Sequence, residues 1–120
     1  MPLKKIFESF RNAFNGMVYL IKTERNFRIE LILAFFVLVL AIFLKIDDWK
    51  LVTLIAVSFL VILLEALNTL VERMVNIFKP RIHPYARVIK DVMASIVLIS
   101  SIGALAIGLI IFIPYIFNCR

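Results

Sequence analysis

Apolar side chains recur every three or four positions over residues 4–22, while charged and amide side chains fill the opposite side. The apolar positions are Ile6, Phe7, Phe10, Phe14, Met17, Val18 and Ile21. This spacing predicts an amphipathic helix with a basic polar face, which suits a position in the membrane interface.

Three long apolar runs follow this segment. They cover about residues 27–46, 51–76 and 85–117. A membrane-spanning helix needs roughly 20 apolar residues. The first run meets this length because Lys45, near its end, can extend its amino group toward the interface. Each run therefore predicts one transmembrane helix.

The connections between the runs are short. Residues 45–50 predict a tight turn in which Trp49 is an interfacial anchor. Pro80 and Pro84 predict a loop over residues 78–84, since two prolines four apart do not fit one regular helix. The pattern predicts an all-α membrane protein with one surface helix and three transmembrane helices.

Composition agrees with this class. A chain of 120 residues with 63% hydrophobic residues and a mean hydropathy of +1.03 is a single domain too apolar for a soluble fold. Residues 1–28 mix charges throughout, so no cleavable signal is expected there. The single cysteine, Cys119, allows no internal disulfide.

The basic residues lie beside the apolar runs, which makes a nucleic-acid partner a weak interpretation of the net charge of +6. Residues 1–28 contain six Lys or Arg and residues 73–91 contain five, against two in the 45–50 turn. Cytoplasmic segments carry the excess of basic residues. The N-terminus and the 73–91 segment are therefore expected in the cytoplasm and the C-terminus outside.

A polar stripe interrupts the second run. Glu65, Asn68, Glu72 and Asn76 fall on one helix face, over about 16 Å. A charged group at membrane depth costs about 2.5–3.5 kcal/mol, so its presence calls for a functional reason.

The predicted helices bring further polar residues to the same membrane boundary. Glu24 and Glu30 lie where the surface helix meets the first span, and Lys90 and Asp91 lie where the third span begins. Carboxylates suit Mg²⁺, which binds through one or two of them plus substrate phosphates. Glu65 is a candidate general base toward a lipid hydroxyl, and a lysine can neutralise phosphate charge. The set fits phosphoryl transfer from ATP to a lipid alcohol, although the chain has no Walker or glycine-rich kinase loop.

Other interpretations exist for each residue alone. Glu65 could serve only as an interhelical hydrogen-bond partner, and Glu24 could sit in a solvated junction. Lys90 and Asp91 could form an interfacial ion pair, and His83 could be a surface residue. For the whole chain, the alternatives are a small ion or proton channel or transporter subunit and a non-catalytic scaffold. The channel hypothesis predicts acids along the whole span, whereas the remaining depth of all three runs lacks them.

Three separated blocks resemble the small prokaryotic diacylglycerol kinase and undecaprenol kinase family. Glu65-Ala-Leu-Asn68-Thr69-Leu-Val-Glu72 resembles the family signature E-x-x-N-S/T-x-x-E. His83 followed seven residues later by Lys90-Asp91, and Glu24-Arg25-Asn26-Phe27-Arg28, resemble two further blocks. The resemblance extends over nearly the whole chain and implies an ATP- and Mg²⁺-dependent lipid kinase that forms a homotrimer with shared active sites.

The resemblance also implies roles for individual residues. It makes Glu65 the catalytic base and Glu24 and Glu72 the Mg²⁺ ligands. The implied nucleotide-binding residues are Glu24, Glu72, Asn68, His83, Lys90, Asp91 and Asn12. The implied lipid-binding residues are Glu65, Lys5, Glu30, Arg28 and Ala94.

The chain departs from the family pattern at four positions. Asn76 replaces the usual Asp, Asn12 a common Tyr, and Met93-Ala94 the usual small residues. The acceptor implied by the resemblance is diacylglycerol, giving phosphatidic acid, or undecaprenol. Thr23-Glu24-Arg25-Asn26 leans toward the undecaprenol branch.

Overall fold

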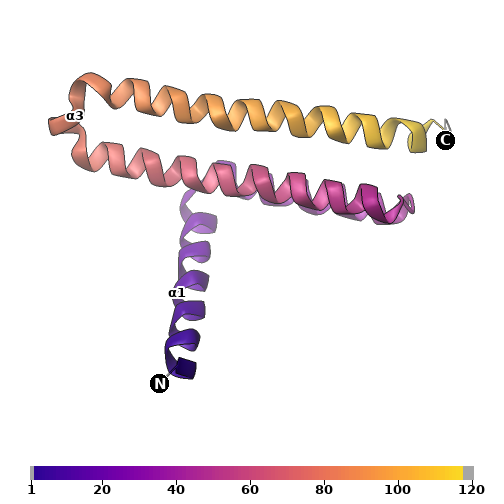
Figure 1. Ribbon diagram of the computed structural model, residues 1–120, viewed down its shortest axis with the longest axis horizontal. Helices are drawn as coiled ribbons and strands as arrows, with labels where there is room; N and C mark the ends of the chain where they lie inside the picture. The colour runs from indigo at the N-terminus through magenta and orange to yellow at the C-terminus, as the bar shows by residue number, and fades with distance from the viewer. Residues whose placement is uncertain (1, 118–120) are drawn as a thin grey trace.

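The computed structural model describes residues 2–117, and this part of the chain contains helices and no strand. The helices are α1 (Pro2–Thr23), α2 (Arg25–Phe43) and α3 (Asp48–Ile116). Cys119 lies outside the described residues. A straight helix of 69 residues would be about 100 Å long, whereas the longest dimension of the structure is 56 Å. α3 therefore folds back on itself, and Figure 1 shows its two arms side by side.

Three segments are long and apolar enough to cross a membrane. They are Arg25–Phe43, which is α2, and the two arms of α3, Asp48–Arg81 and His83–Ile116. α1 runs across the direction of these spans (Figure 1). Most of their large apolar side chains are exposed, as expected when lipid is the solvent. The predicted surface helix and three transmembrane helices are confirmed.

The end of α2 explains the tight turn to α3. Lys45 has a φ of 56° and lies just beyond the C-cap residue Leu44. The Lys45 amide donates to the Ile42 carbonyl and the Ile46 amide to the Ala41 carbonyl, both at 3.1 Å. These two bonds form a Schellman motif, and Ile46 and Ala41 are both buried in the same apolar cluster, as this motif favours. We call this end of the bundle the turn end.

The main apolar core lies at the turn end. Its buried members are Ala41, Ile46, Leu54, Ile111 and Phe112, from α2, the turn and both arms of α3. The Tyr115 hydroxyl accepts a hydrogen bond of 3.4 Å from the Asp47 amide. The Lys50 ammonium lies 5.0 Å from the centre of the Tyr115 ring. The second arm is thereby attached to the α2–α3 turn.

The reversal inside α3 differs from the sequence prediction. Helical structure continues through Pro80 and Pro84, so the predicted non-helical loop at 78–84 is wrong as secondary structure. Each proline removes one helical hydrogen bond and clashes with the preceding turn, which bends a helix without ending it. The chain still reverses direction here (Figure 1). We call residues 76–91 the hairpin tip.

Candidate functional site

Two polar residues of the first arm of α3 are as buried as the apolar core. Glu65 is 4% exposed and Thr69 is 2% exposed. The Thr69 hydroxyl donates to the backbone carbonyl of Glu65 at 3.3 Å, which satisfies it within the helix. The Glu65 carboxylate interacts with the side chain of Asn68. A buried carboxylate in a chain that exposes most of its large apolar side chains marks a functional site.

Three other carboxylates lie close enough to act on Glu65 electrostatically. They are Glu24, Glu30 and Glu72. Glu24 is the single non-helical residue between α1 and α2, Glu30 lies in the second turn of α2, and Glu72 lies two turns beyond Glu65. We call these four residues the acidic cluster, and the end of the bundle that contains them the corner end. The structure thus brings together four site residues predicted from the sequence.

An arginine that the sequence analysis did not single out completes this region. Arg73 forms an ion pair with the Glu24 carboxylate. Its guanidinium also donates to the Tyr19 hydroxyl at 3.0 Å and lies 5.7 Å from the centre of the Tyr19 ring. Its position directly after Glu72, beside the polar stripe, is the one signal for Arg73 in the sequence, but membrane topology accounts for a basic residue there as well.

The side chain of Arg28, a predicted lipid-binding residue, contacts the end of α1. Its guanidinium donates to the carbonyls of Ile21 and Lys22, at 2.7 and 3.2 Å. These carbonyls belong to the last turn of α1, where carbonyls have no partner within the helix. In this structure Arg28 therefore stabilises the corner between α1 and α2.

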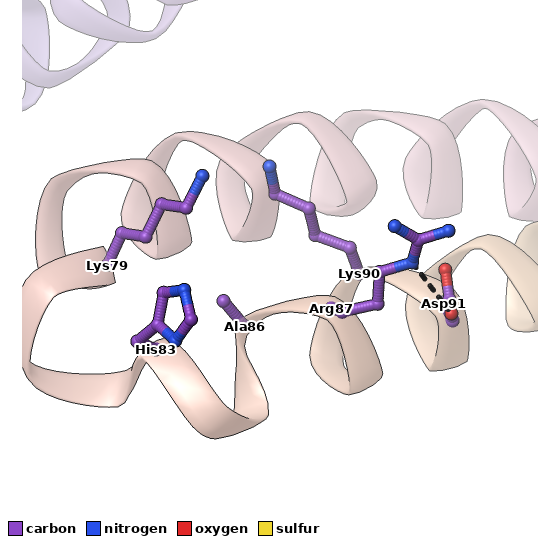
Figure 2. A pocket seen from close by; sticks show the side chains of 6 residues that line it. All are labelled: Lys79, His83, Ala86, Arg87, Lys90 and Asp91. Atoms are coloured by element: carbon purple, nitrogen blue, oxygen red, sulfur yellow. Dashed lines mark ion pairs between the residues drawn. The ribbon is translucent and has the colours of Figure 1, made fainter.

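The hairpin tip contains a second group of site residues around a pocket of about 460 Å³. The residues that line it are Lys79, His83, Ala86, Arg87, Lys90 and Asp91. Figure 2 shows the amino groups of Lys79 and Lys90 pointing the same way, with the His83 ring between the Lys79 and Ala86 side chains. The carboxylate of Asp91 pairs with the Arg87 guanidinium at 3.8 Å. Four basic or imidazole side chains and one carboxylate make this pocket suited to anionic phosphates.

Lys90 connects the pocket to the first arm. Its ammonium donates to the amide oxygen of Asn76 at 2.7 Å. Asn76 lies four residues, or about 6 Å along the helix, beyond Glu72. The basic pocket therefore lies next to the acidic cluster, because Lys90 of the second arm contacts the first arm just beyond Glu72. Lys79 and Arg87 are lining residues that the sequence analysis did not select.

Two predicted site residues lie apart from both groups in a single copy of the chain. Lys5 and Asn12 are exposed on α1, which leads away from the spans (Figure 1). Lys5 lies 19 residues before Glu24, about 28 Å along the helix. Ala94 is exposed on the second arm of α3.

The acidic cluster fits a metal ion that arrives with its own oxygen ligands. Among residues 2–117, no three acidic or imidazole groups stand close enough together to hold a metal ion by themselves. Mg²⁺ binds through one or two carboxylates and completes its shell with phosphate oxygens and water. Arg73 pairs with Glu24 through one carboxylate oxygen, and within residues 2–117 no basic side chain forms an ion pair with Glu30, Glu65 or Glu72. Glu24 and Glu72 are the residues that would hold the metal ion.

Fold and site together define a multi-pass, all-helical membrane protein with a carboxylate site at one end of its spans. The model of the prokaryotic diacylglycerol kinase family matches residues 11–112. An undecaprenol kinase from Bacillus subtilis is 33% identical over 114 residues, covering 93% of this chain and 91% of that protein. A diacylglycerol kinase from Synechocystis is 35% identical over 107 residues, covering 88% of this chain and 61% of that protein.

The chain belongs to the prokaryotic diacylglycerol kinase family. It is a bacterial multi-pass membrane protein and a lipid kinase. A kinase of this family uses ATP as the phosphoryl donor. The resemblance found in the three sequence blocks is confirmed.

Proposed function

We propose that this kinase transfers the γ-phosphoryl group of ATP, with Mg²⁺, to the hydroxyl of a membrane lipid. Diacylglycerol is the first candidate acceptor, and phosphatidic acid is then the product. The observation that carries the proposal is the buried carboxylate of Glu65, surrounded by Glu24, Glu30 and Glu72 at one end of the spans.

Glu65 and Asn68 prepare the acceptor. Glu65 accepts the proton of the lipid hydroxyl, because it is the most buried carboxylate of the cluster and lies on the apolar side of the stripe. Asn68 orients that carboxylate through its side chain. The lipid oxygen then forms a bond to the γ-phosphorus as the bond from phosphorus to the ADP oxygen breaks, in line and without a covalent enzyme intermediate.

The remaining residues bind the donor. Glu24 and Glu72 hold Mg²⁺, which when bound neutralises charge on the phosphates. Lys90, His83 and Asp91 lie around the phosphates and nucleotide in the hairpin tip, where the neighbouring cations of Lys79 and Arg87 add to the positive potential. Glu30 lines an apolar groove between α2 and both arms of α3 and marks the lipid side of the site.

Undecaprenol is the second candidate acceptor. The Bacillus subtilis undecaprenol kinase matches this chain over 91% of its own length, whereas the match to the Synechocystis diacylglycerol kinase covers 61% of that protein. A long polyprenol and a diacylglycerol both present a primary hydroxyl at the membrane boundary. The proposed transfer of the hydroxyl proton to Glu65 is therefore the same for either lipid.

We place the N-terminus and hairpin tip in the cytoplasm and the C-terminus outside, from the distribution of basic residues. We also propose a homotrimer in which neighbouring copies share each active site. Lys5 and Asn12 lie on α1, away from the acidic cluster of their own copy, so in such an assembly they would contribute to a neighbour's site. Ala94, one turn beyond Asp91 on the second arm, would contact the lipid.

Replacing the proposed base is the direct test. Glu65→Gln keeps the size of the side chain but cannot accept the hydroxyl proton, so lipid phosphorylation should fall at least about 100-fold. The measurement is transfer of labelled phosphate to lipid, with helicity and particle size compared in detergent. Glu8→Gln, at an exposed glutamate of α1, is the matched control and should retain activity. Near-normal turnover of a folded Glu65→Gln variant would exclude the proposal.

The acceptor and the rival class are tested with the same purified protein. ATP consumption is measured against diacylglycerol and undecaprenol side by side in mixed micelles. The preferred lipid should raise the rate well above the lipid-free level. Ion or proton flux in liposomes without ATP, together with no consumption of ATP, would instead support a channel or transporter subunit.

A further inference from the structure

The contact between Glu24 and Arg73 joins two helices that are distant in the sequence. Glu24 is the N-cap residue of α2, yet its side chain makes no capping hydrogen bond to that helix. Its carboxylate is turned toward Arg73 instead, and only 18% of the side chain is exposed. A carboxylate this buried requires a cation, and in this structure the guanidinium of Arg73 supplies it.

The Arg73 guanidinium contacts one carboxylate oxygen of Glu24, Oε2. A divalent metal on the other oxygen would lie next to this guanidinium, and the two cations would repel one another. We infer that Arg73 is the counter-ion of Glu24 and that it moves away from Glu24 when the metal binds. The inference rests on the proposed function, because it takes Glu24 to be a metal ligand.

Tyr19 determines where Arg73 remains after the exchange. Its hydroxyl accepts a hydrogen bond from the guanidinium and its ring lies beneath it, and neither contact involves Glu24. The guanidinium therefore stays next to Glu72 on α3, beside the position of a metal-bound phosphate. Arginine binds phosphate oxygens in pairs through its planar set of donors. Arg73 is thus a positioning residue. It pairs with Glu24 before the metal binds and lies next to the nucleotide phosphates after the metal has bound.

Mn²⁺ binding without nucleotide tests the exchange independently of catalysis. Mn²⁺ is titrated into the full-length protein in detergent, and free Mn²⁺ is followed by electron paramagnetic resonance. Arg73→Gln should bind Mn²⁺ about tenfold more tightly than the wild type, since an adjacent opposite charge alters the affinity of a carboxylate for another cation by about one to three powers of ten. Glu24→Gln removes one of the few carboxylates available to Mn²⁺ and should weaken its binding.

Further variants separate the counter-ion role from a purely structural one. Arg73→Lys keeps the charge and should restore wild-type Mn²⁺ affinity, whereas Arg11→Gln, at an exposed arginine of α1, should change nothing. Tyr19→Phe loses the hydroxyl that holds the guanidinium after the exchange, so it should weaken Mn²⁺ binding, in the direction opposite to Arg73→Gln. In the kinase reaction, Arg73→Gln should raise the KM for ATP more than it lowers kcat.

The outcomes also distinguish this inference from the proposed function. Equal Mn²⁺ affinity in the wild type, Arg73→Gln and Tyr19→Phe, with lipid phosphorylation intact, would overturn the exchange alone. Mn²⁺ affinity unchanged by Glu24→Gln would likewise overturn it. A wild-type protein that phosphorylates no lipid would overturn the proposed function, whatever the metal titration gives. If Arg73→Gln fails to fold, Tyr19→Phe and Arg73→Lys still decide the matter.

Discussion

At the scale of single residues, the contact between Lys90 and Asn76 shows how one side chain can be positioned without losing its charge. The Lys90 ammonium donates to a neutral amide oxygen at 2.7 Å. An aspartate at position 76 would hold the ammonium equally well but would neutralise it. The amide therefore leaves the full positive charge of Lys90 available to a phosphate.

Asn76→Asp should weaken nucleotide binding for this reason. The new carboxylate pairs with Lys90 and repels phosphate, so the KM for ATP should rise about three- to tenfold, with a smaller change in kcat. Steady-state kinetics at saturating lipid measure both constants. Asn26→Asp, at an exposed position near the corner end, controls for the added charge. An unchanged KM would show that Lys90 does not meet the nucleotide.

The site residues differ in how far the sequence alone could identify them. Glu65 could be predicted because a carboxylate inside an apolar run is costly, and its burial agrees with that argument. Arg73 could not, because a basic residue at the end of a span is also what membrane topology requires. Arg73 pairs with Glu24 because of the way α1 and α2 meet beside α3. This tertiary contact cannot be predicted from the spacing of residues along one helix.

At the scale of the helices, the turn after α2 places a residue with a side chain in a conformation that suits glycine. Lys45 has a positive φ, at the C′ position of the Schellman motif. Residues other than glycine pay about 1–2 kcal/mol in this region because the Cβ atom crowds the backbone. The buried pair of Ile46 and Ala41 maintains the motif in spite of this cost.

Lys45→Gly should therefore stabilise the protein, by about 0.5–1 kcal/mol. Unfolding in detergent micelles, followed by circular dichroism as sodium dodecyl sulfate is added, measures the change. Lys50→Gly provides the contrast, since position 50 lies within a helix and its side chain contacts Tyr115, so the protein should lose at least about 1 kcal/mol. Destabilisation by Lys45→Gly would mean that the lysine side chain contributes more than its backbone strain costs.

The helices themselves were the most predictable part of the structure. Long apolar runs must form helices in lipid, because every backbone amide has to find its partner within the segment. The hairpin tip was less predictable, because proline indicates a break in the pattern but not its form. At Pro80 and Pro84 the chain reversed while its helical turns continued, and no residue pattern at 78–84 distinguishes this from an irregular loop.

At the scale of the whole molecule, the apolar core and the candidate functional site lie at opposite ends of the spans. The buried apolar cluster lies at the turn end, and the acidic cluster and basic pocket lie at the corner end and hairpin tip. The two regions share the first arm of α3 but no residue. A change in one should therefore leave the other nearly intact.

Leu54→Ala tests this separation. Leu54 is 3% exposed in the apolar core, so its truncation should lower the free energy of unfolding by about 1–3 kcal/mol through lost packing. The kcat of the remaining folded enzyme should change less than twofold. Leu63→Ala, at an exposed position of the same arm, should alter neither quantity appreciably. A large fall in kcat for Leu54→Ala would show that the two ends are coupled.

The distance between the hairpin tip and the corner end has a consequence for how the two substrates reach the site. Arg73 lies level with Glu24, and the first arm continues eight residues further to Arg81, about 12 Å. Under the proposed function, nucleotide arrives and leaves through water at the tip, while the lipid moves sideways within its leaflet and stops at Glu65. Since neither route crosses the other, a departing product of one kind does not block the entry of the other kind, and no fixed order of loading is imposed by the shape of the molecule.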